Sequence, residues 1–428
     1  MLTGTSAIVF GVVVICVAAV LLVKQYETRL VLIAAGLLMA LVAFSPLKAF
    51  SGFTSNMTSG GLIQSICSSM GFAFVLQLTE CDKHLIYALA NGLKRVRFII
   101  IPGAALITFL INISITSAAG CAAAVGVVLI PLLISQGVAP ALAASAIMLG
   151  TFGSTLGPGN PHNVMVADIA KISVTDVIST HAVASFACLA AGVAALLLVG
   201  RFRKETSGFT SPDWTFDGNF NIKPWLSILP LVPVIILVIF NQNGVRVALP
   251  WAKQIGVPHA MLVGSFLCIA LSGANFQTAT KKFFEGMGKG YADIMGIIIA
   301  SGVFIQGMTA LGMIDAFINL LKSSADIARI AAAYGPFVLA VLSGSGDAAT
   351  LAFNQAVTPQ AAAIGIAPSD LGFLASLTGS LGRTMSPIAG AAIICAGLAK
   401  VTPFDMAKRN VFGMLSASVV ALVVLMYL

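Results

Sequence analysis

The chain has 428 residues, of which 58% are hydrophobic and 9% are charged, and its formal net charge is +8. Soluble proteins carry roughly 25% charged residues, so this chain has too little polar side chain to cover a globule in water and its outer surface must face lipid. The basic excess fits the orientation of a membrane protein better than nucleic-acid binding. We therefore expect an all-α integral membrane protein whose partner is membrane lipid and not nucleic acid.

Long apolar runs mark the conventional membrane spans, because a spanning helix needs about 20 mostly apolar residues. They lie at about residues 6–23, 30–47, 61–79, 178–200, 224–241, 259–275, 291–313 and 410–428. Residues 201–223 form the longest polar stretch, which we interpret as a cytoplasmic linker between two halves. No extramembrane catalytic domain fits there.

Two further stretches, residues 98–170 and 327–398, are interrupted by Gly, Ser, Thr, Asn and Pro at what should be membrane depth. Irregular backbone is tolerated there only where it lines a protein cavity. We interpret each stretch as a re-entrant hairpin followed by a broken helix. The hairpins are predicted at about 98–134 and 327–360, and the broken helices at about 138–170 and 369–398. The fold prediction is about 11 transmembrane helices plus two re-entrant hairpins.

Basic residues orient this arrangement. With the amino terminus outside, the predicted cytoplasmic segments hold 16 of the 23 Lys and Arg residues, as the positive-inside rule requires. Both termini are then predicted to be periplasmic. The start of the chain has no basic residue before its apolar run, so we do not expect a removable signal peptide.

The second half of the chain echoes the first at an offset of about 228 residues. The matched residues are Pro131, Gly137, Ala139 and Pro140 against Pro359, Gly365, Ala367 and Pro368. The span prediction puts Lys171 outside and Lys400 inside, so residues 1–200 and 224–428 would be repeats of inverted topology. Inverted repeats with segments broken by Gly and Pro indicate a secondary transporter whose site lies near the bilayer midplane.

The hairpin turns are candidates for substrate binding. The first turns at residues 115–120 (ITSAAG) and the second at residues 343–350 (SGSGDAAT). A helix that restarts after such a turn points free N–H groups and a positive dipole end at the cavity, which suits an anion. Thr116, Ser117, Ser345 and Gly346 are the candidates, and the alternative is that small residues permit tight helix packing.

The broken helices offer a second set of polar groups. Their sequences are GTFGSTLGPGNPHN at 150–163 and TGSLGRTMSP at 378–387. The side-chain donors and acceptors there are Ser154, Thr155, Asn160, Asn163, Ser380, Thr384 and Ser386. Unwound carbonyls of this kind also suit a sodium ion.

Arg383 is the sharpest single feature, because an Arg at a helix centre in the membrane costs roughly 2.5 to 3.5 kcal/mol on insertion scales. Its planar fork matches a carboxylate substrate in bidentate fashion, and a permanent salt bridge to Asp347 is the alternative. Asp347 is a candidate proton or cation site, or else a cap of the helix that begins at Ala348. His162 is either a titrating group or a polar side chain lining the cavity.

Other classes of protein find less support. The sequence has no HExxH motif, no paired carboxylates within the predicted spans and only four histidines, so we do not expect an enzyme. The seven cysteines are scattered singly, and neither a metal nor a cofactor is expected. A passive channel is a further alternative, but sealed hairpins with one central Arg suit a saturable site better than a continuous pore.

Three segments resemble the DcuC family of anaerobic C4-dicarboxylate carriers, within the ion transporter superfamily. They are SGSGDAATLAFNQAVTP, SLGRTMSPIAGAAIICAGLAKVTPFDMAKR and ASGVFIQGMTALGMI, all between residues 291 and 412. The resemblance implies a bacterial inner-membrane secondary carrier of succinate, fumarate, malate or aspartate, working by antiport or by symport with H⁺ or Na⁺. It also implies elevator-type motion of the hairpins and a homodimer.

Carried over to this sequence, the resemblance places the hairpin tip at Ser345 to Asp347 and the broken helix at Ser380 to Pro387, with Arg383 as the carboxylate ligand. Asp347 is a departure, since some members carry Asn there. The coupling-ion candidates are Asp347, His162 and Asn163. Because the family includes carriers of other substrates, transport of another organic anion or an amino acid is the alternative function.

Overall fold

A computed structural model describes residues 5–94, 99–210, 220–322 and 325–427. The described residues form helices and contain no strand, which confirms the all-α prediction. Nine described helical segments are long and apolar enough to cross a membrane, and four further apolar helices are shorter. The composition argument therefore correctly predicts a multi-pass helical protein.

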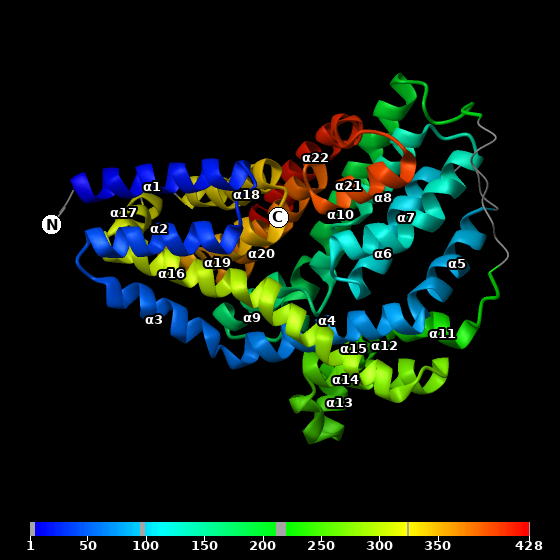
Figure 1. The fold of residues 1–428 in the computed structure, drawn as a ribbon, viewed down its shortest axis with the longest axis horizontal. Coiled ribbons are helices and arrows are strands. Elements are labelled where there is room, and N and C mark those ends of the chain that lie inside the picture. The colour runs from blue at the N-terminus through cyan, green and yellow to red at the C-terminus, as the bar shows by residue number, and fades with distance from the viewer. Residues whose placement is uncertain (1–4, 95–98, 211–219, 323–324, 428) are drawn as a thin grey trace.

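The first part of the chain forms outer helices before the first interrupted stretch begins (Figure 1). These are α1 (Thr5–Val23), α2 (Thr28–Val42), α3 (Pro46–Met57), α4 (Gly60–Thr79) and α5 (Cys81–Leu93). The run predicted at 30–47 is split into two helices. Ser45 is the N-cap residue of the separate helix α3, which begins with Pro46 at its first position. Neither α3 nor α5 is apolar enough to be predicted as a span.

The first interrupted stretch contains a helical hairpin and a helix broken in its middle. The hairpin arms are α6 (Ile100–Ser114) and α7 (Ala118–Ser135). The broken helix consists of α8 (Pro140–Gly150), the 3₁₀ turn η2 (Gly153–Leu156) and α9 (Pro161–Ala170), and α10 (Val174–Phe202) follows it. Gly153 packs directly on the backbone of Phe109 and leaves no room for a β-carbon, which brings the break close to the hairpin.

The middle of the chain returns to outer helices. These are α11 (Pro224–Ile228), η3 (Leu229–Leu231), α12 (Val232–Asn241), α13 (Asn243–Ala248), η4 (Pro250–Gln254), α14 (Val257–Ser272), α15 (Phe276–Lys289), the π-helical turn η5 (Gly290–Met295), α16 (Gly296–Ala310) and α17 (Met313–Lys322). In Figure 1, α16 lies beside α2, and the two pack together.

The second interrupted stretch also has a helical hairpin, a broken helix and a closing long helix, but its 3₁₀ segment precedes the broken helix and does not interrupt it. Its hairpin consists of α18 (Ala325–Ser343) and α19 (Gly346–Ala356), followed by η6 (Thr358–Ile364). Its broken helix consists of α20 (Pro368–Met385) and α21 (Gly390–Ala399), and α22 (Pro403–Met426) closes the described chain. Gly382 packs on the backbone of Phe337 as closely as Gly153 does on Phe109.

The two stretches also end alike. Lys171 and Lys400 each close a helix in the left-handed region, at φ 57° and 55°. Each is followed by a capping box that starts the next long helix, formed by Ser173 with Asp176 and by Thr402 with Asp405.

Buried apolar residues divide the molecule into one large core and smaller ones. The large core joins both hairpins, both broken helices, α10 and α22. Separate clusters hold together α1, α2, α16 and α17, and α4 with α11, α12, α14 and α15. The hairpins and broken helices thus form one packed body beside the outer helices.

Candidate functional site

The two hairpin turns meet the two helix breaks at one place. A β-carbon at Gly157, in the first break, would lie 3.0 Å from the side chain of Thr116, in the first turn. A β-carbon at Gly344, in the second turn, would lie 2.9 Å from the carbonyl oxygen of Ile388, in the second break. One built at Gly390 would lie 3.8 Å from Ala119. The structure therefore brings together segments from both halves of the chain.

Four helices begin at this meeting point, namely α7, α9, α19 and α21. Three begin with a side-chain cap: the Ser117 hydroxyl accepts from the Gly120 N–H at 3.2 Å, Asn160 Oδ1 accepts from the His162 N–H at 2.8 Å, and the Ser345 hydroxyl accepts from the Ala348 N–H at 3.2 Å. The cap of α21, Ala389, has no polar side chain. Each helix start carries partial positive charge, so four of them together create a strong preference for an anion.

Arg383 adds a full positive charge beside these helix starts, next to Gly346 of the second turn. Its Nη2 donates to the carbonyl oxygen of Thr151 at 2.9 Å and its Nη1 to the Thr151 hydroxyl at 3.3 Å. Thr151 is fully buried and caps the C-terminal end of α8, where the helix dipole favours a cation. The guanidinium has five donors, so these two bonds leave three for another ligand.

Asp347 pairs with His162 and not with Arg383. Its Oδ1 lies 3.0 Å from Nε2 of His162, which joins the second hairpin to the first broken helix. The side chain of His162 is 3% exposed and that of Asp347 is 53% exposed, so the pair joins a buried ring to a half-exposed carboxylate. The helix cap at this turn is Ser345, so the capping role considered for Asp347 is wrong.

Side-chain amides fix the shape of the first break. Asn112 Oδ1 accepts from the Ser154 N–H at 2.7 Å, and Asn160 Nδ2 donates to the Ser154 carbonyl at 2.9 Å. Asn163 Nδ2 donates to the carbonyls of Thr155 and Gly157 at 2.7 and 3.0 Å. Its Oδ1 is buried and has no hydrogen-bond partner. The amides thus hold the unwound backbone open and leave one buried oxygen available.

Four of the five hydroxyl groups predicted in the broken helices are already engaged as donors. Thr155 donates to the Phe152 carbonyl at 2.8 Å, Ser380 to the Ser376 carbonyl at 2.9 Å and Thr384 to the Ser380 carbonyl at 2.8 Å. Ser386 donates across to Val341 of α18 at 2.7 Å. These hydroxyls support the local backbone here, and each would have to rotate to donate to a ligand.

Sequence reasoning missed Thr151 and Asn112, the two residues that hold Arg383 and the first break. Thr151 directly follows Gly150 at the start of the broken motif, and this position could have identified it as a site residue. Asn112 is a lone amide inside an apolar helix arm, where an unpaired polar side chain would be costly. Both residues act across long sequence distances.

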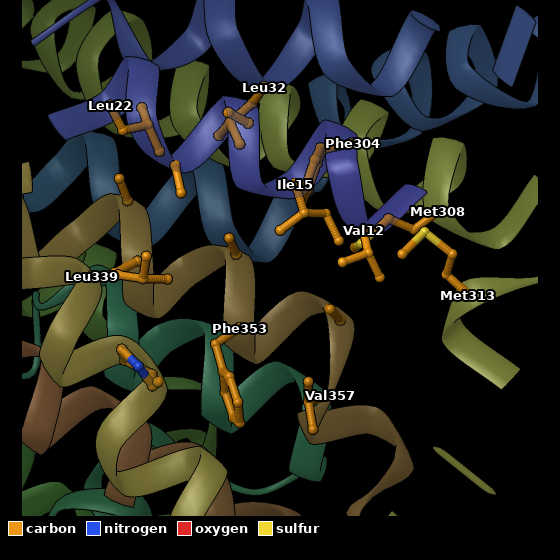
Figure 2. A pocket seen from close by; sticks show the side chains of 18 of the residues that line it. Val12, Ile15, Leu22, Leu32, Phe304, Met308, Met313, Leu339, Phe353 and Val357 are labelled. Carbon is orange, nitrogen blue, oxygen red and sulfur yellow. The ribbon is translucent and has the colours of Figure 1, made fainter. Parts of the chain in front are cut away.

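A separate apolar cavity of about 550 Å³ lies behind the second hairpin (Figure 2). Figure 2 shows Val12, Ile15 and Leu22 of α1 on one wall and Leu339 and Phe353 of the hairpin on the other. Among its lining residues only Ser343 has a polar side chain, so this cavity is not the anion site.

Membrane-spanning helices, helix starts facing each other at two breaks and one central Arg define a membrane transporter. The model of the DcuC family, described as "C4-dicarboxylate anaerobic carrier", matches residues 43–428, and the chain belongs to this family. The chain is 24% identical to the anaerobic C4-dicarboxylate transporter DcuC of Escherichia coli K12, with 97% of this chain and 95% of that one covered. An uncharacterized transporter of Haemophilus influenzae is 37% identical over 61% of this chain and 96% of its own length.

Two solved structures share the fold. MtrF of Neisseria gonorrhoeae, described with a class of antimetabolite efflux pumps, superposes with a TM-score of 0.61 at 13% identity, over 90% of this chain and 85% of that one. The YdaH transporter of Alcanivorax borkumensis gives 0.59 at 14% identity, over 88% and 86%. At these identities the likeness concerns the fold alone.

Proposed function

We propose that the protein is a secondary transporter of C4-dicarboxylates such as succinate, fumarate, malate and aspartate across the bacterial inner membrane. The observation that carries the proposal is the convergence of four helix starts and the Arg383 guanidinium at one point between the two halves. Arg383 binds one carboxylate with the donors that Thr151 leaves free. The uncapped start of α21 and the turns at Thr116 and Ser117 bind the other.

The remaining predicted ligands complete this site. Ser345 and Gly346 place the start of α19 beside Arg383, and Ser154 and Asn160 shape the opposite side. Thr155, Ser380, Thr384 and Ser386 contribute after their hydroxyls rotate away from the backbone carbonyls that they now contact.

The matched elements support a repeat of inverted topology. Lys171 and Lys400, with the capping boxes that follow them, occur at an offset of 229 residues and in the same local conformation. The separate apolar cores support an elevator mechanism, in which the hairpin body moves as a unit along the outer helices. The outer helices would then also form the contact of a homodimer, with both chain termini periplasmic.

A coupled cation, H⁺ or Na⁺, offsets the charge of the substrate. The Asp347–His162 pair is the proton site in this scheme, because it joins a half-exposed carboxylate to a buried imidazole beside the anion site. Asn163 is the sodium candidate, since its buried Oδ1 lacks a partner next to the unwound carbonyls of the first break.

Asp347 also favours a second candidate function, transport of an amino acid on the same fold. A carboxylate that is half exposed among four positive helix starts would bind a substrate ammonium group. A substrate with both an ammonium and a carboxylate would then bridge Asp347 and Arg383.

Counterflow into liposomes tests the proposal. Purified protein is reconstituted with unlabelled succinate, fumarate, aspartate or arginine inside, and uptake of labelled succinate is followed under separate sodium and pH gradients. Saturable exchange with dicarboxylates supports the proposed function, and the gradient that drives net uptake identifies the ion. Stimulation by arginine alone would favour the amino-acid carrier, and no flux with any internal substrate would refute both.

A further inference from the structure

The apolar cavity behind the second hairpin separates two parts of the molecule (Figure 2). One wall belongs to the outer helices α1, α2, α16 and α17, and the other to α18 and α19. The hairpin side of the cavity leaves space because the residues of α19 that line it are small. They are Ala348, Ala349, Ala352 and Ala356. The cavity therefore lies directly behind the turn that carries Asp347.

Ordered water does not suit this space. A buried water needs two to four polar partners, and the lining supplies one hydroxyl, that of Ser343. The lining follows α1 from Ile8 to Leu22, a length of about 21 Å.

The cavity is continuous with the surface that faces the bilayer. Val12 of α1 and Leu339 and Leu342 of α18 line it, yet they are 49%, 39% and 46% exposed. Along α1, Val13 and Val17 continue this exposed apolar surface outside the cavity. A lipid chain can thus reach the cavity sideways without crossing a polar layer.

One end of the cavity is polar and basic. Gln25 Nε2 donates to the carbonyl of Ser343 at 3.0 Å, just beyond Leu22, and joins α1 to the turn of the hairpin. Lys24, between Leu22 and Gln25, is exposed at the same end. An occupant with an apolar tail and an anionic head would match both the lining and this end.

We propose that the cavity binds one acyl chain of a membrane phospholipid, with its phosphate near Lys24. The apolar wall is about 21 Å long, and the hydrocarbon part of one leaflet is about 15 Å thick, half of the hydrocarbon core. The wall is therefore long enough for an acyl chain of one leaflet. The chain fills the space between the outer helices and the back of the second hairpin. The proposal rests on the cavity and not on the identity of the transported substrate.

Quenching by brominated lipid tests the site. Trp214, Trp225 and Trp251 are replaced by Phe, and a single reporter Phe353→Trp faces the cavity. In vesicles of phosphatidylglycerol brominated on its acyl chains, we expect quenching of this reporter to at least half the extent seen for Val183→Trp, which is at a 74% exposed position on α10. Adding Ala352→Leu, which narrows the cavity, should lower quenching of the first reporter at least twofold and leave the second unchanged. An unquenched first reporter beside a quenched second one would refute the proposal.

Native mass spectrometry provides a test that needs no reporter. Wild-type protein released from phosphatidylglycerol membranes should retain phospholipid, and Ala352→Leu and Lys24→Gln should each reduce the retained fraction at least twofold. Lys48→Gln, on α3, is the matched control for removal of a surface charge. Equal retention by wild type, Ala352→Leu and Lys24→Gln would overturn the proposal, as would retention of detergent in place of phospholipid. Either result can occur whether or not the protein carries dicarboxylates.

Discussion

Replacing Arg383 by Lys tests the central ligand most sharply. Arg383 uses two donors on Thr151 and has three left, enough for a bidentate pair with a carboxylate. A lysine has three donors on a single nitrogen, and one of them would be needed for the Thr151 carbonyl. The other two diverge from one atom and cannot match both oxygens of a carboxylate, so lysine can form about one bond to the substrate. The variant keeps the charge and loses one charge-assisted hydrogen bond.

A hydrogen bond to a charged group contributes about 1.5 to 3 kcal/mol, which corresponds to about 10- to 150-fold in affinity. We expect Arg383→Lys to raise the KM for succinate counterflow by this factor. Arg329→Lys is the matched control, because Arg329 forms an ion pair with Asp326, which is 65% exposed, and the loss of this pair should change little. Unchanged affinity in Arg383→Lys would refute bidentate recognition.

Three further substitutions test the surroundings of the site and one buried carboxyl. Thr151→Val removes one acceptor from Arg383 and should raise the KM about 3- to 10-fold, since one hydrogen bond contributes about 1 kcal/mol. Asp347→Asn should abolish stimulation of uptake by the coupling-ion gradient while counterflow persists. Burial raises the pKa of Asp82, at the start of α5, to about 6 from its ordinary value of 3.8. The native state then holds this proton more tightly than the unfolded state, so the stability that protonation gives is lost as pH rises from about 4 to 6. The whole loss is about 3 kcal/mol, of which about 1.4 kcal/mol falls between pH 5 and pH 8, and Asp82→Asn should remove it from thermal unfolding compared at these two values.

Each of these changes has a control. Thr79→Val removes a buried hydroxyl of α4 that donates to the Val75 carbonyl of its own helix, so an equal effect on KM would refute a special role for Thr151. Asp168→Asn removes an exposed acid at the far end of α9, and loss of coupling there as well would exclude a specific role for Asp347. A Tm of Asp82→Asn that changes with pH as in wild type would contradict the reasoning for Asp82.

Local sequence features predicted the backbone of the site well. Gly, Ser and Pro at membrane depth indicated breaks within residues 150–163 and 378–387. The first helix is interrupted there, whereas α20 stays helical to Met385 and the second break covers only residues 386–389. Hydroxyl residues at turns indicated helix starts, and Ser117 and Ser345 cap α7 and α19. These features follow from chain chemistry over a few residues, so they can be found without a structure.

The contacts between the halves could not be predicted in the same way. Asp347 was considered as a partner of Arg383 because both are charged and lie in the same half, yet it contacts His162 of the other half. Arg383 likewise bonds Thr151, a residue with no distinctive pattern of its own. Such pairs depend on how two hairpins fold across each other, which composition and spacing do not specify.

Substrate protection of a cysteine in the first hairpin turn tests the central claim, that the substrate lies where the four helices begin. Cys16 is the exposed cysteine among the seven, so Cys16→Ser with Ser117→Cys creates one accessible thiol at the turn. We predict that succinate slows its reaction with a membrane-permeant maleimide at concentrations near the KM, and that Ser179→Cys in the same background reacts at an unchanged rate. If the Ser117→Cys protein still transports succinate but its labelling rate does not change when succinate is added, the substrate does not lie where the four helices begin.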